Sequence, residues 1–434
     1  MAETVFALAT APGTAAIAII RLGGPAATAA LERLTRRPAP APRQAVRRSL
    51  LAADGATLDE ALVLRFVAPH SYTGDDLIEL HCHGGRAVVA AVLRRLTEDP
   101  ALTPAAPGAF TQRAFQNGRL DLTQIEGLGD LLAAESEGQR RLALGGLSGR
   151  LRRRAEDWRA RLIHALAMVE ATIDWADEEV PEDVSPTVVT EITQLSQELT
   201  GILATRDAAE RLRTGLEVVL LGAPNAGKST LLNSLTGRDV AIEADRPGTT
   251  RDLIECPMEI DGLPVTLIDT AGLNPTPDEI EAMGIERAAN RARDADLRLF
   301  LHAPDAPLPP SAAGFRQPQD LDVATKADLG ALPGIAITVS ARRRADIDRL
   351  RGVLAGRLAD RVAGAGLISH VRQEQCVAAA ATHLAAAARA MDSAGAEIVA
   401  EELRGAVRAL ERLTGRIGAE DVLDSVFSAF CLGK

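Results

Sequence analysis

The chain has 434 residues, of which 47% are hydrophobic and 25% charged, and its net charge is −11. This length allows two to four domains with cores of their own, and the composition is that of a soluble globular protein whose acidic balance argues against a uniformly basic nucleic-acid binder. Four widely spaced cysteines indicate no disulfide framework, and the lack of a basic leader or a long apolar run predicts a cytoplasmic protein with no membrane span.

The first part of the chain mixes strand and helix patterns. Short apolar runs predict strands at Ala16–Leu22, Ala61–Val67 and Asp76–His81. A helix is expected at Gly85–Leu96, so the pattern is α+β. The run His81-Cys82-His83 has metal-binding residue types, but no fourth ligand is evident. We therefore interpret it as a strand end rather than a zinc site.

From about residue 120 the pattern becomes helical. Steps of three, four and seven residues predict one long helix, with the apolar stripe Leu151, Trp158, Leu162, Leu166, Val169 and Ile173. The acidic, proline-broken stretch Asp174–Pro186 ends this helix, and another helical run is expected at about 187–213. Helices return after about residue 369, at Glu397–Leu413 and Asp421–Phe430. Because strands and helices alternate between these helical parts, we predict a helical domain with an inserted domain.

Two features of the basic residues stand out. Only three of the 48 are lysines, namely Lys228, Lys326 and Lys434. Since an ammonium and a guanidinium differ in size and hydrogen-bond geometry, we expect each lysine to mark a place where arginine does not fit. Eight arginines gather at positions 140, 141, 150, 152, 153, 154, 159 and 161. They form either a solvated helix face or a local surface for nucleic acid or a partner.

The run Gly222-Ala-Pro-Asn-Ala-Gly-Lys-Ser229 matches a phosphate-binding loop. It follows a predicted strand, Glu217–Leu221, and precedes a predicted helix, Thr230–Leu235, as this motif requires. Backbone N–H groups of the loop and the helix N-terminus would hold phosphates. Lys228 would reach the β and γ oxygens, and the Ser229 hydroxyl would bind Mg²⁺. The nucleotide-binding residues expected here are Asn225, Ala226, Gly227, Lys228, Ser229 and Thr230.

Two further stretches fit a GTPase. Asp269-Thr-Ala-Gly272 follows the apolar strand Val265–Ile268, where an aspartate holds the Mg²⁺ shell and a glycine N–H senses the γ-phosphate. Pro247-Gly-Thr-Thr-Arg-Asp252 predicts a switch whose Thr250 hydroxyl completes the Mg²⁺ sphere. The nucleotide contacts expected in these stretches are Ala244, Asp245, Arg246, Pro247, Gly248, Thr249, Thr250, Asp269, Thr270, Ala271 and Gly272.

Thr325-Lys326-Ala-Asp328 is the candidate base-selecting motif. The Asp328 carboxylate can accept from guanine N1–H and N2–H₂, whereas adenine offers no amine there. The Lys326 stem would lie along the base, and Ser340-Ala341, after a predicted strand at Ile335–Val339, would touch guanine O6. In this order the motifs specify GTP. Leu273 replaces the water-orienting glutamine of Ras-like proteins, and Asn225 is placed to hold a monovalent cation.

Three motifs outside the GTPase block closely resemble the MnmE (TrmE) family of tRNA-modification GTPases. They are SYTGDDLIELHCHGG at 71–85, PGAFTQRAFQNGRLDL at 107–122 and FCLGK at 430–434. The resemblance runs essentially end to end and implies a multidomain α/β fold. It implies an α+β folate-binding and dimerisation domain at 1–118, a discontinuous helical domain at 119–214 and 365–434, and an inserted Ras-like P-loop G domain at 215–364.

The resemblance also implies the activity. The family works as a homodimer with an FAD-dependent partner, MnmG, in a heterotetramer. Together they install a carboxymethylaminomethyl-type group on C5 of the wobble uridine, U34, of certain tRNAs. A 5,10-methylene- or 5-formyl-tetrahydrofolate supplies one carbon, and K⁺-stimulated GTP hydrolysis drives the opening and closing of paired G domains. No membrane is involved.

The resemblance also implies which residues of this sequence form the folate, K⁺ and catalytic sites. Its folate positions match Arg21, Glu79 and Lys434, with Arg119 where lysine is usual. Its K⁺ ligands match the Asn225 side chain, the Ala244 and Arg246 carbonyls and the Thr249 hydroxyl. Its catalytic positions match Lys228, Asp269, the water-orienting Glu281 and the terminal Cys431. Whether Cys431 is a nucleophile, an orienting group or a packing residue stays open.

Three departures from the family pattern bear on the expectations. Thr325 replaces asparagine in the base motif, Arg119 replaces lysine, and residues 303–320 are proline-rich where the family has a helix. We expect guanine preference to be retained and this flank of the G domain to be trimmed. Two other readings stay open: a ribosome-assembly GTPase, which shares the phosphate loop and DTAG but lacks the flanking motifs, and a folate-binding regulator whose GTPase only signals.

Overall fold

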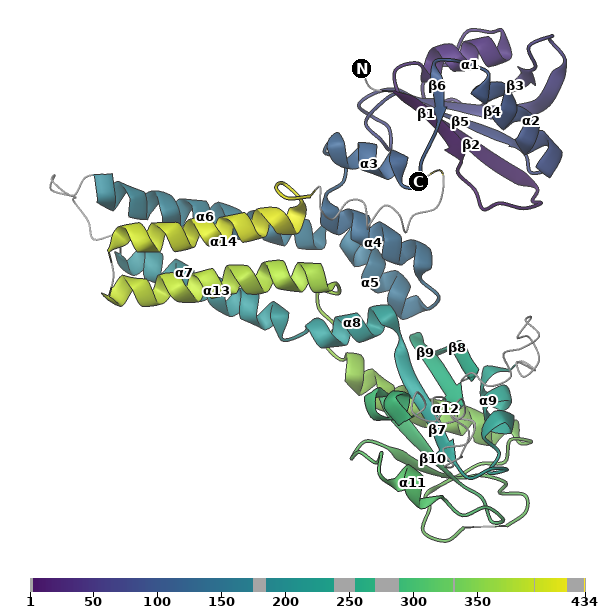
Figure 1. Ribbon diagram of the computed structural model, residues 1–434, viewed down its shortest axis with the longest axis vertical. Helices are drawn as coiled ribbons and strands as arrows, with labels where there is room; N and C mark the ends of the chain where they lie inside the picture. Colours follow the sequence, from purple (N-terminus) through teal and green to yellow (C-terminus); the bar gives the residue numbers. More distant parts are fainter. Residues whose placement is uncertain are drawn as a thin grey trace, which may run out of the picture. The chain divides into compact units, whose positions relative to one another are not determined.

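The structure is a computed structural model that describes residues 3–174, 185–237, 254–269, 289–330, 332–393, 395–419 and 433. Its contacts form two compact units, coloured along the sequence in Figure 1. Unit 1 comprises residues 1–129, 146–195 and 379–434, and unit 2 comprises residues 130–145 and 196–378. The four-part domain division expected from the sequence stays a prediction.

Unit 1 begins with a six-stranded sheet in the order β3-β4-β5-β2-β1-β6. The strands are β1 (Thr4–Leu8), β2 (Ile17–Gly23), β3 (Val46–Leu51), β4 (Thr57–Phe66), β5 (Leu77–His83) and β6 (Leu102–Pro104). Neighbours are antiparallel except β1 and β6. Alternate side chains such as Ile20 and Leu80 form one core with α1 (Ala27–Thr35) and α2 (Arg86–Thr97). Phe110 of α3 (Ala109–Gln116) packs in a separate cluster with Val5 and Leu77.

The predicted strands and helix of this part are confirmed, with shifted ends. The run His81-Cys82-His83 forms the end of β5, as expected. Its alternation buries Cys82 in the core, while the His81 and His83 rings face Glu79 and Asp59. Strands β1, β3 and β6 were not predicted.

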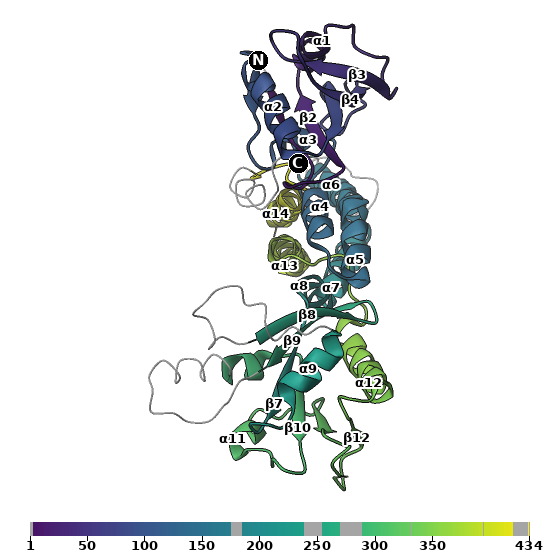
Figure 2. The ribbon, with the colours of Figure 1, turned by 90° about the vertical axis from the view of Figure 1, so that its right-hand side faces the viewer.

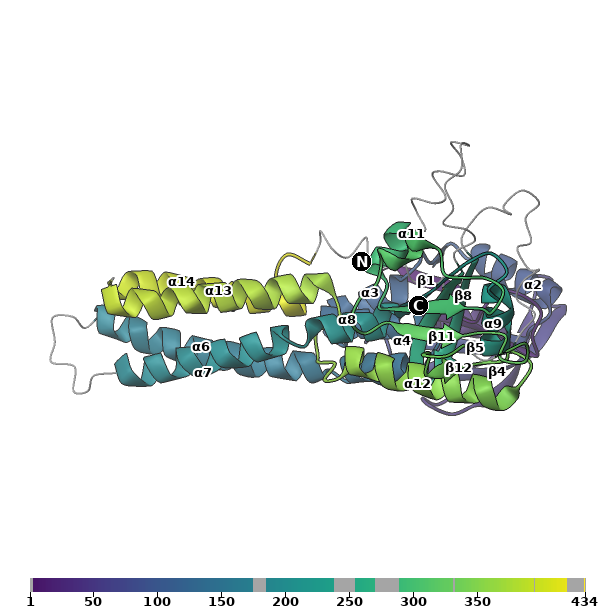
Figure 3. The same cartoon turned by 90° about the horizontal axis from the view of Figure 1, so that it is seen from below.

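Unit 1 continues with a bundle of long helices. Figures 1 and 3 show α6 (Arg150–Asp174) and α14 (Ala396–Thr414) side by side with α7 (Ser185–Leu203) and α13 (Val371–Ser393). The buried stripe of α6 runs through Ala165 rather than Leu166, which is half-buried. The predicted helical run at 187–213 is in fact α7 and α8 (Arg206–Thr214), with a break at 204–205. The helix expected at Asp421–Phe430 lies outside the described residues.

Unit 2 holds the second six-stranded sheet, in the order β12-β11-β10-β7-β9-β8 (Figure 2). Its strands are β7 (Leu216–Gly222), β8 (Ile254–Ile260), β9 (Leu263–Asp269), β10 (Leu297–His302), β11 (Leu321–Ala324) and β12 (Ile337–Thr338). All pairings are parallel except β8–β9. Strand β7 carries the buried apolar run Val218–Leu221, as is typical of parallel sheets covered by helices.

Among the described residues, unit 2 contains α8, α9 (Lys228–Thr236), α11 (Pro310–Ala313) and α12 (Arg344–Val362), together with most of α5 (Glu137–Leu147). Helix α4 (Leu122–Ala133) lies mainly in unit 1. The predicted strand–loop–helix around the phosphate loop is confirmed, and the proline-rich stretch 303–320 contains only the four-residue α11. No helix in the described part of the chain is long and apolar enough to cross a membrane.

Candidate functional site: a nucleotide pocket and an arginine pocket

The phosphate loop between β7 and α9 wraps around the Lys228 ammonium. Asn225 and Gly227 have φ of 63° and 91°, left-handed conformations that let the loop curl. Lys228 is buried, and its Nζ donates to the Gly222 and Ala223 carbonyls, each at 3.1 Å. Burial lowers the pKa of Lys228, while the nearby Asp269 carboxylate opposes that shift. The amine therefore lies inside the loop that would bind phosphates.

Ser229 and Asp269 meet beside this lysine. The Ser229 hydroxyl donates to Asp269 Oδ2 at 2.7 Å, while the buried Oδ1 has no hydrogen-bond partner among the described residues. An unpaired buried carboxylate oxygen is costly and suits a hard cation such as Mg²⁺. No group of three or more His, Cys, Asp or Glu side chains in the described ranges could hold a metal. Ser229 and Asp269 supply only two oxygen ligands, and this number suits Mg²⁺ because the ion also takes oxygens from phosphates and water.

A cavity of about 240 Å³ adjoins the loop. Its lining is Gly227, Thr230, Leu231, Thr325, Lys326, Asp328, Leu329, Val339, Ser340, Ala341 and Arg342. Ser340 Oγ donates to Asp328 Oδ1 at 2.9 Å, and this hydrogen bond is the largest cause that lowers the pKa of Asp328. The carboxylate thus stays ionised and able to accept from the two donors on a guanine edge.

Thr325 joins the base motif to the phosphate loop. Its buried hydroxyl donates to the Ala226 carbonyl at 2.6 Å, and its backbone N–H donates to the His302 carbonyl at 2.8 Å. A threonine in place of asparagine therefore still connects the two motifs.

Lys326 is held by a residue that the sequence did not reveal. It has a left-handed φ of 53°, and its Nζ donates to both carboxylate oxygens of Asp305, at 2.9 and 2.7 Å. Asp305 lies in a turn between Ala303 and Ala306, both buried, within the proline-rich stretch. The proline-rich stretch thus contributes an ion pair to the edge of the cavity.

A second candidate site in unit 1 is the group of side chains in contact with Arg21, which is called the arginine pocket below because it is the predicted folate site. Arg21 and Glu79 are opposite each other on β2 and β5, and Glu79 Oε1 accepts from Arg21 Nη2 at 2.8 Å and from Nε at 3.2 Å. The guanidinium carbon lies 5.4 Å from the Tyr72 ring centre and 5.6 Å from that of Phe110, within cation–π range. These two aromatic contacts were missed, although Tyr72 lies in the SYTGDD motif and is the only tyrosine in the sequence.

The C-terminal motif reaches this pocket through Gly433. Arg21 Nη1 donates to the Gly433 carbonyl at 3.1 Å. Gly433 is buried with φ of 92°, and a Cβ there would lie 2.3 Å from the Leu8 carbonyl oxygen, so only glycine fits. Arg119 lies beside Gly74, where a Cβ on that glycine would come within 3.2 Å of Arg119 Cγ. The Arg119 side chain makes no hydrogen bond or ion pair within the described ranges.

Comparison with known proteins identifies the family of the chain. A family model of the TrmE N-terminus matches residues 4–119, and one of the MnmE helical domain matches residues 122–431. A relative from Roseobacter denitrificans, named tRNA modification GTPase MnmE, is 47% identical over the whole of both chains. The chain belongs to the MnmE (TrmE) family of tRNA modification GTPases.

A second full-length relative and one solved structure are also similar to this chain. The MnmE of Parvibaculum lavamentivorans is 48% identical, again over the whole of both chains. Among solved structures, Aquifex aeolicus Era bound to GDP·AlF₄⁻ is 26% identical and covers 32% of this chain and 56% of its own. Its TM-score of 0.28 is too low to carry an argument.

Several predicted site residues lie outside the described residues. They are Ala244, Asp245, Arg246, Pro247, Gly248, Thr249, Thr250, Thr270, Ala271, Gly272, Glu281, Cys431 and Lys434. Their roles stay predictions.

The arginine-rich stretch is largely paired. Arg140 and Arg141 both contact Glu137, within unit 2. In unit 1, Arg152, Arg159 and Arg161 contact Glu156, Glu411 and Glu191. Much of its positive charge is therefore neutralised, which favours the solvated helix face over a nucleic-acid surface.

Proposed function

We propose that this chain is the GTP-hydrolysing component of a system that modifies C5 of the tRNA wobble uridine, U34, with a tetrahydrofolate one-carbon unit. The observation that carries the proposal is the hydrogen bond from Arg21 to the Gly433 carbonyl, which joins positions 412 apart in the chain. It brings the C-terminal motif to the proposed folate pocket in a chain that also holds a nucleotide cavity. A ribosome-assembly GTPase, which lacks the flanking motifs, has no need of this second site.

In the nucleotide pocket, the chain's own groups divide the work. Lys228 would neutralise charge on the β and γ oxygens, Ser229 and Thr250 would bind Mg²⁺, and Asp269 would hold the shell around the ion. Asp328 would select guanine, and Glu281 would orient the attacking water. K⁺, held by the Asn225 side chain, the Ala244 and Arg246 carbonyls and the Thr249 hydroxyl, would supply positive charge to the transition state. Leu273 supports this arrangement because the glutamine of Ras-like proteins is missing.

In the arginine pocket, the basic Arg21 and Lys434 would suit an acidic, glutamate-tailed tetrahydrofolate, and Glu79 would accept from its pterin N–H groups. Arg119 is a further proposed folate position. The paired contacts of Arg21 support a rigid pocket, since a guanidinium held on two sides loses little freedom on binding. We further propose a cytoplasmic homodimer whose G domains pair, and a heterotetramer with an FAD-dependent MnmG-type partner that acts on tRNA.

The deciding experiment is mass spectrometry of wobble uridines in a deletion strain, with and without this gene restored. Loss of the U34 modification in the deletion strain, with its return when the gene is restored, supports the proposal. Normal U34 in the deletion strain overturns it. In that second case, a ribosome-assembly defect would favour the hypothesis of a ribosome-assembly GTPase, and the absence of such a defect would favour the folate-binding regulator. Separately, GTP turnover should be faster in K⁺ than in Na⁺. Equal rates would remove the cation assignment but not the GTPase.

A further inference from the structure

The β8–β9 hairpin links the nucleotide pocket to a distant turn. Its two-residue turn, Asp261–Gly262, has φ of 50° and 82°, and pairing extends from Ile260↔Leu263 to Ile254↔Asp269. Strand β9 has seven residues, from Leu263 beside this turn to Asp269 at its other end. It spans about 23 Å at the usual rise of a strand. One end of the hairpin is therefore the proposed Mg²⁺ site, and the other end is Gly262.

The turn end of the hairpin caps helix α5. The first N–H groups of a helix lack partners within the helix. Ser136 and Gln139 satisfy part of this need with a reciprocal capping box, in which Ser136 Oγ accepts from Gln139 N at 3.3 Å and Gln139 Oε1 accepts from Ser136 N at 3.1 Å. Glu137 N donates to Glu259 Oε2 at 3.2 Å, and Gly138 N donates to the Gly262 carbonyl at 2.8 Å. Two partners of the first turn of α5 thus come from the hairpin.

The fit at this contact is close. A Cβ on Gly138 would lie 2.7 Å from the Gly262 carbonyl oxygen and 2.9 Å from a methyl group of Leu212. Glycine weakens a helix, so its use in the first turn of α5 is explained by this approach. Other contacts fix the partners: Arg351 donates to the Glu259 carbonyl at 3.1 Å, and Gln139 Nε2 donates to the Arg213 carbonyl at 2.9 Å.

We propose that Glu259 and Gly262 are positioning residues that transmit the nucleotide state from Asp269 to helix α5. A strand in a sheet is nearly inextensible, so a shift of Asp269 on nucleotide or Mg²⁺ binding moves Gly262 with it. That movement makes or breaks the hydrogen bonds from Glu137 N to Glu259 and from Gly138 N to Gly262. The inference rests on the proposed function only in that GTP binds at Lys228 and Ser229.

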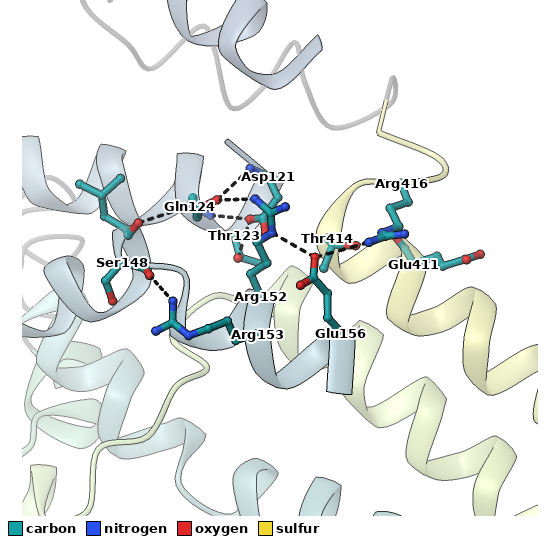
Figure 4. A network of polar contacts seen from close by, with 11 residues as sticks. Asp121, Thr123, Gln124, Ser148, Arg152, Arg153, Glu156, Glu411, Thr414 and Arg416 are labelled. Carbon is teal, nitrogen blue, oxygen red and sulfur yellow. Dashed lines mark hydrogen bonds and ion pairs between the residues drawn. The ribbon is translucent and has the colours of Figure 1, made fainter. Parts of the chain in front are cut away.

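The other end of α5 shows where the signal can go. The Leu147 carbonyl, the last of α5, accepts from Gln124 Nε2 at 3.0 Å. Figure 4 shows Gln124 in a network with Asp121 and Arg152, which continues through Glu156 to Arg416 beyond the end of α14. Helix α5 therefore carries a nucleotide-sensitive cap at its start and a contact with the helical part at its end.

Hydrogen–deuterium exchange of the α5 peptide tests this transmission in the full-length protein, with GDP and with GDP plus aluminium fluoride. In the wild type, exchange should differ between the two nucleotide states by about fivefold, the factor for one helix cap of average strength. In Gly138→Ala the difference should vanish while GTP turnover stays within about twofold. Gly201→Ala is the matched control, since this helical glycine has open space around it, and it should behave like the wild type.

A second pair of variants separates transmission from mere stability. Glu259→Gln keeps an oxygen acceptor for Glu137 N and should preserve the nucleotide-dependent difference, whereas Glu259→Ala should reduce it. A purely structural role would change exchange equally in both nucleotide states. Equal exchange of α5 in the two states of the wild type would overturn the inference, as would a full difference in Gly138→Ala. Neither result depends on U34 chemistry, so the proposed function would survive or fail on its own assay.

Discussion

Replacing Gly433 by alanine should detach the C-terminal motif from the arginine pocket. The new Cβ would lie 2.3 Å from the Leu8 carbonyl oxygen and 2.5 Å from the Ala9 Cα, and neither is a flexible side-chain end that can move aside. The left-handed φ of 92° adds about 1–2 kcal/mol of strain for any L residue. Undocking also removes the hydrogen bond from Arg21, and hydrogen bonds to charged groups contribute about 1.5–3 kcal/mol. We therefore expect tetrahydrofolate affinity to fall by about ten- to a hundredfold.

Isothermal titration with 5-formyl-tetrahydrofolate measures this loss. Gly418→Ala is the matched control, because Gly418 also has a positive φ, of 62°, but nothing lies within 4 Å of its Cβ position. It carries the backbone strain without the collision, and it should bind like the wild type. GTP turnover should be the same in all three proteins. Equal folate affinities of the two alanine variants would refute the reasoning that Gly433 docks the chain end.

Three further predictions concern single side chains. Asp305→Asn removes the ion pair that holds Lys326 and should speed mant-GDP release about two- to fivefold, as expected for an exposed pair. An unchanged release rate would show that this ion pair does not position Lys326 for the nucleotide. Thr325→Val leaves the Ala226 carbonyl without its donor and should weaken mant-GTP binding about tenfold, and retained affinity would contradict the proposed connection. Burial raises the pKa of Asp121, so its protonation favours the folded state, and this contribution is present at low pH and lost as pH rises through the raised pKa. The Tm advantage of Asp121→Asn over the wild type should therefore grow from pH 4 to pH 6, and a constant difference across that range would argue against the shift.

Local patterns in the sequence were sufficient to predict the strand, loop and helix that surround Lys228 in the nucleotide pocket. The strand, glycine-rich loop and helix around Lys228 are contiguous, and the motif dictates their geometry. Thr325 and Asp328 follow strand β11, and parallel strands present their carboxyl ends at one edge of a sheet, so their convergence could be predicted too.

Contacts made between distant parts of the chain could not be predicted in this way. The Asp305 ion pair lies in a stretch whose prolines indicated only a loop, and nothing in its spacing points to Lys326. The stripe of α6 was misassigned at Leu166 because the buried residue there is the neighbouring Ala165, whose small side chain gives only a weak hydrophobic pattern. Strand β3 carries two consecutive arginines, which hid its pattern until pairing with β4 was known.

The scarcity of lysine gives the nucleotide pocket an unusual chemical signature. Apart from the chain's own α-amino group, primary amines occur only at Lys228, Lys326 and Lys434. Lys228 is enclosed by the phosphate loop, and Lys326 lines the adjoining cavity. An amine-acylating reagent followed by intact mass measurement would therefore report on at most three side chains. Because the loop itself already covers Lys228, loss of the acyl group at Lys326 on adding nucleotide would mark occupancy of the cavity that this lysine lines.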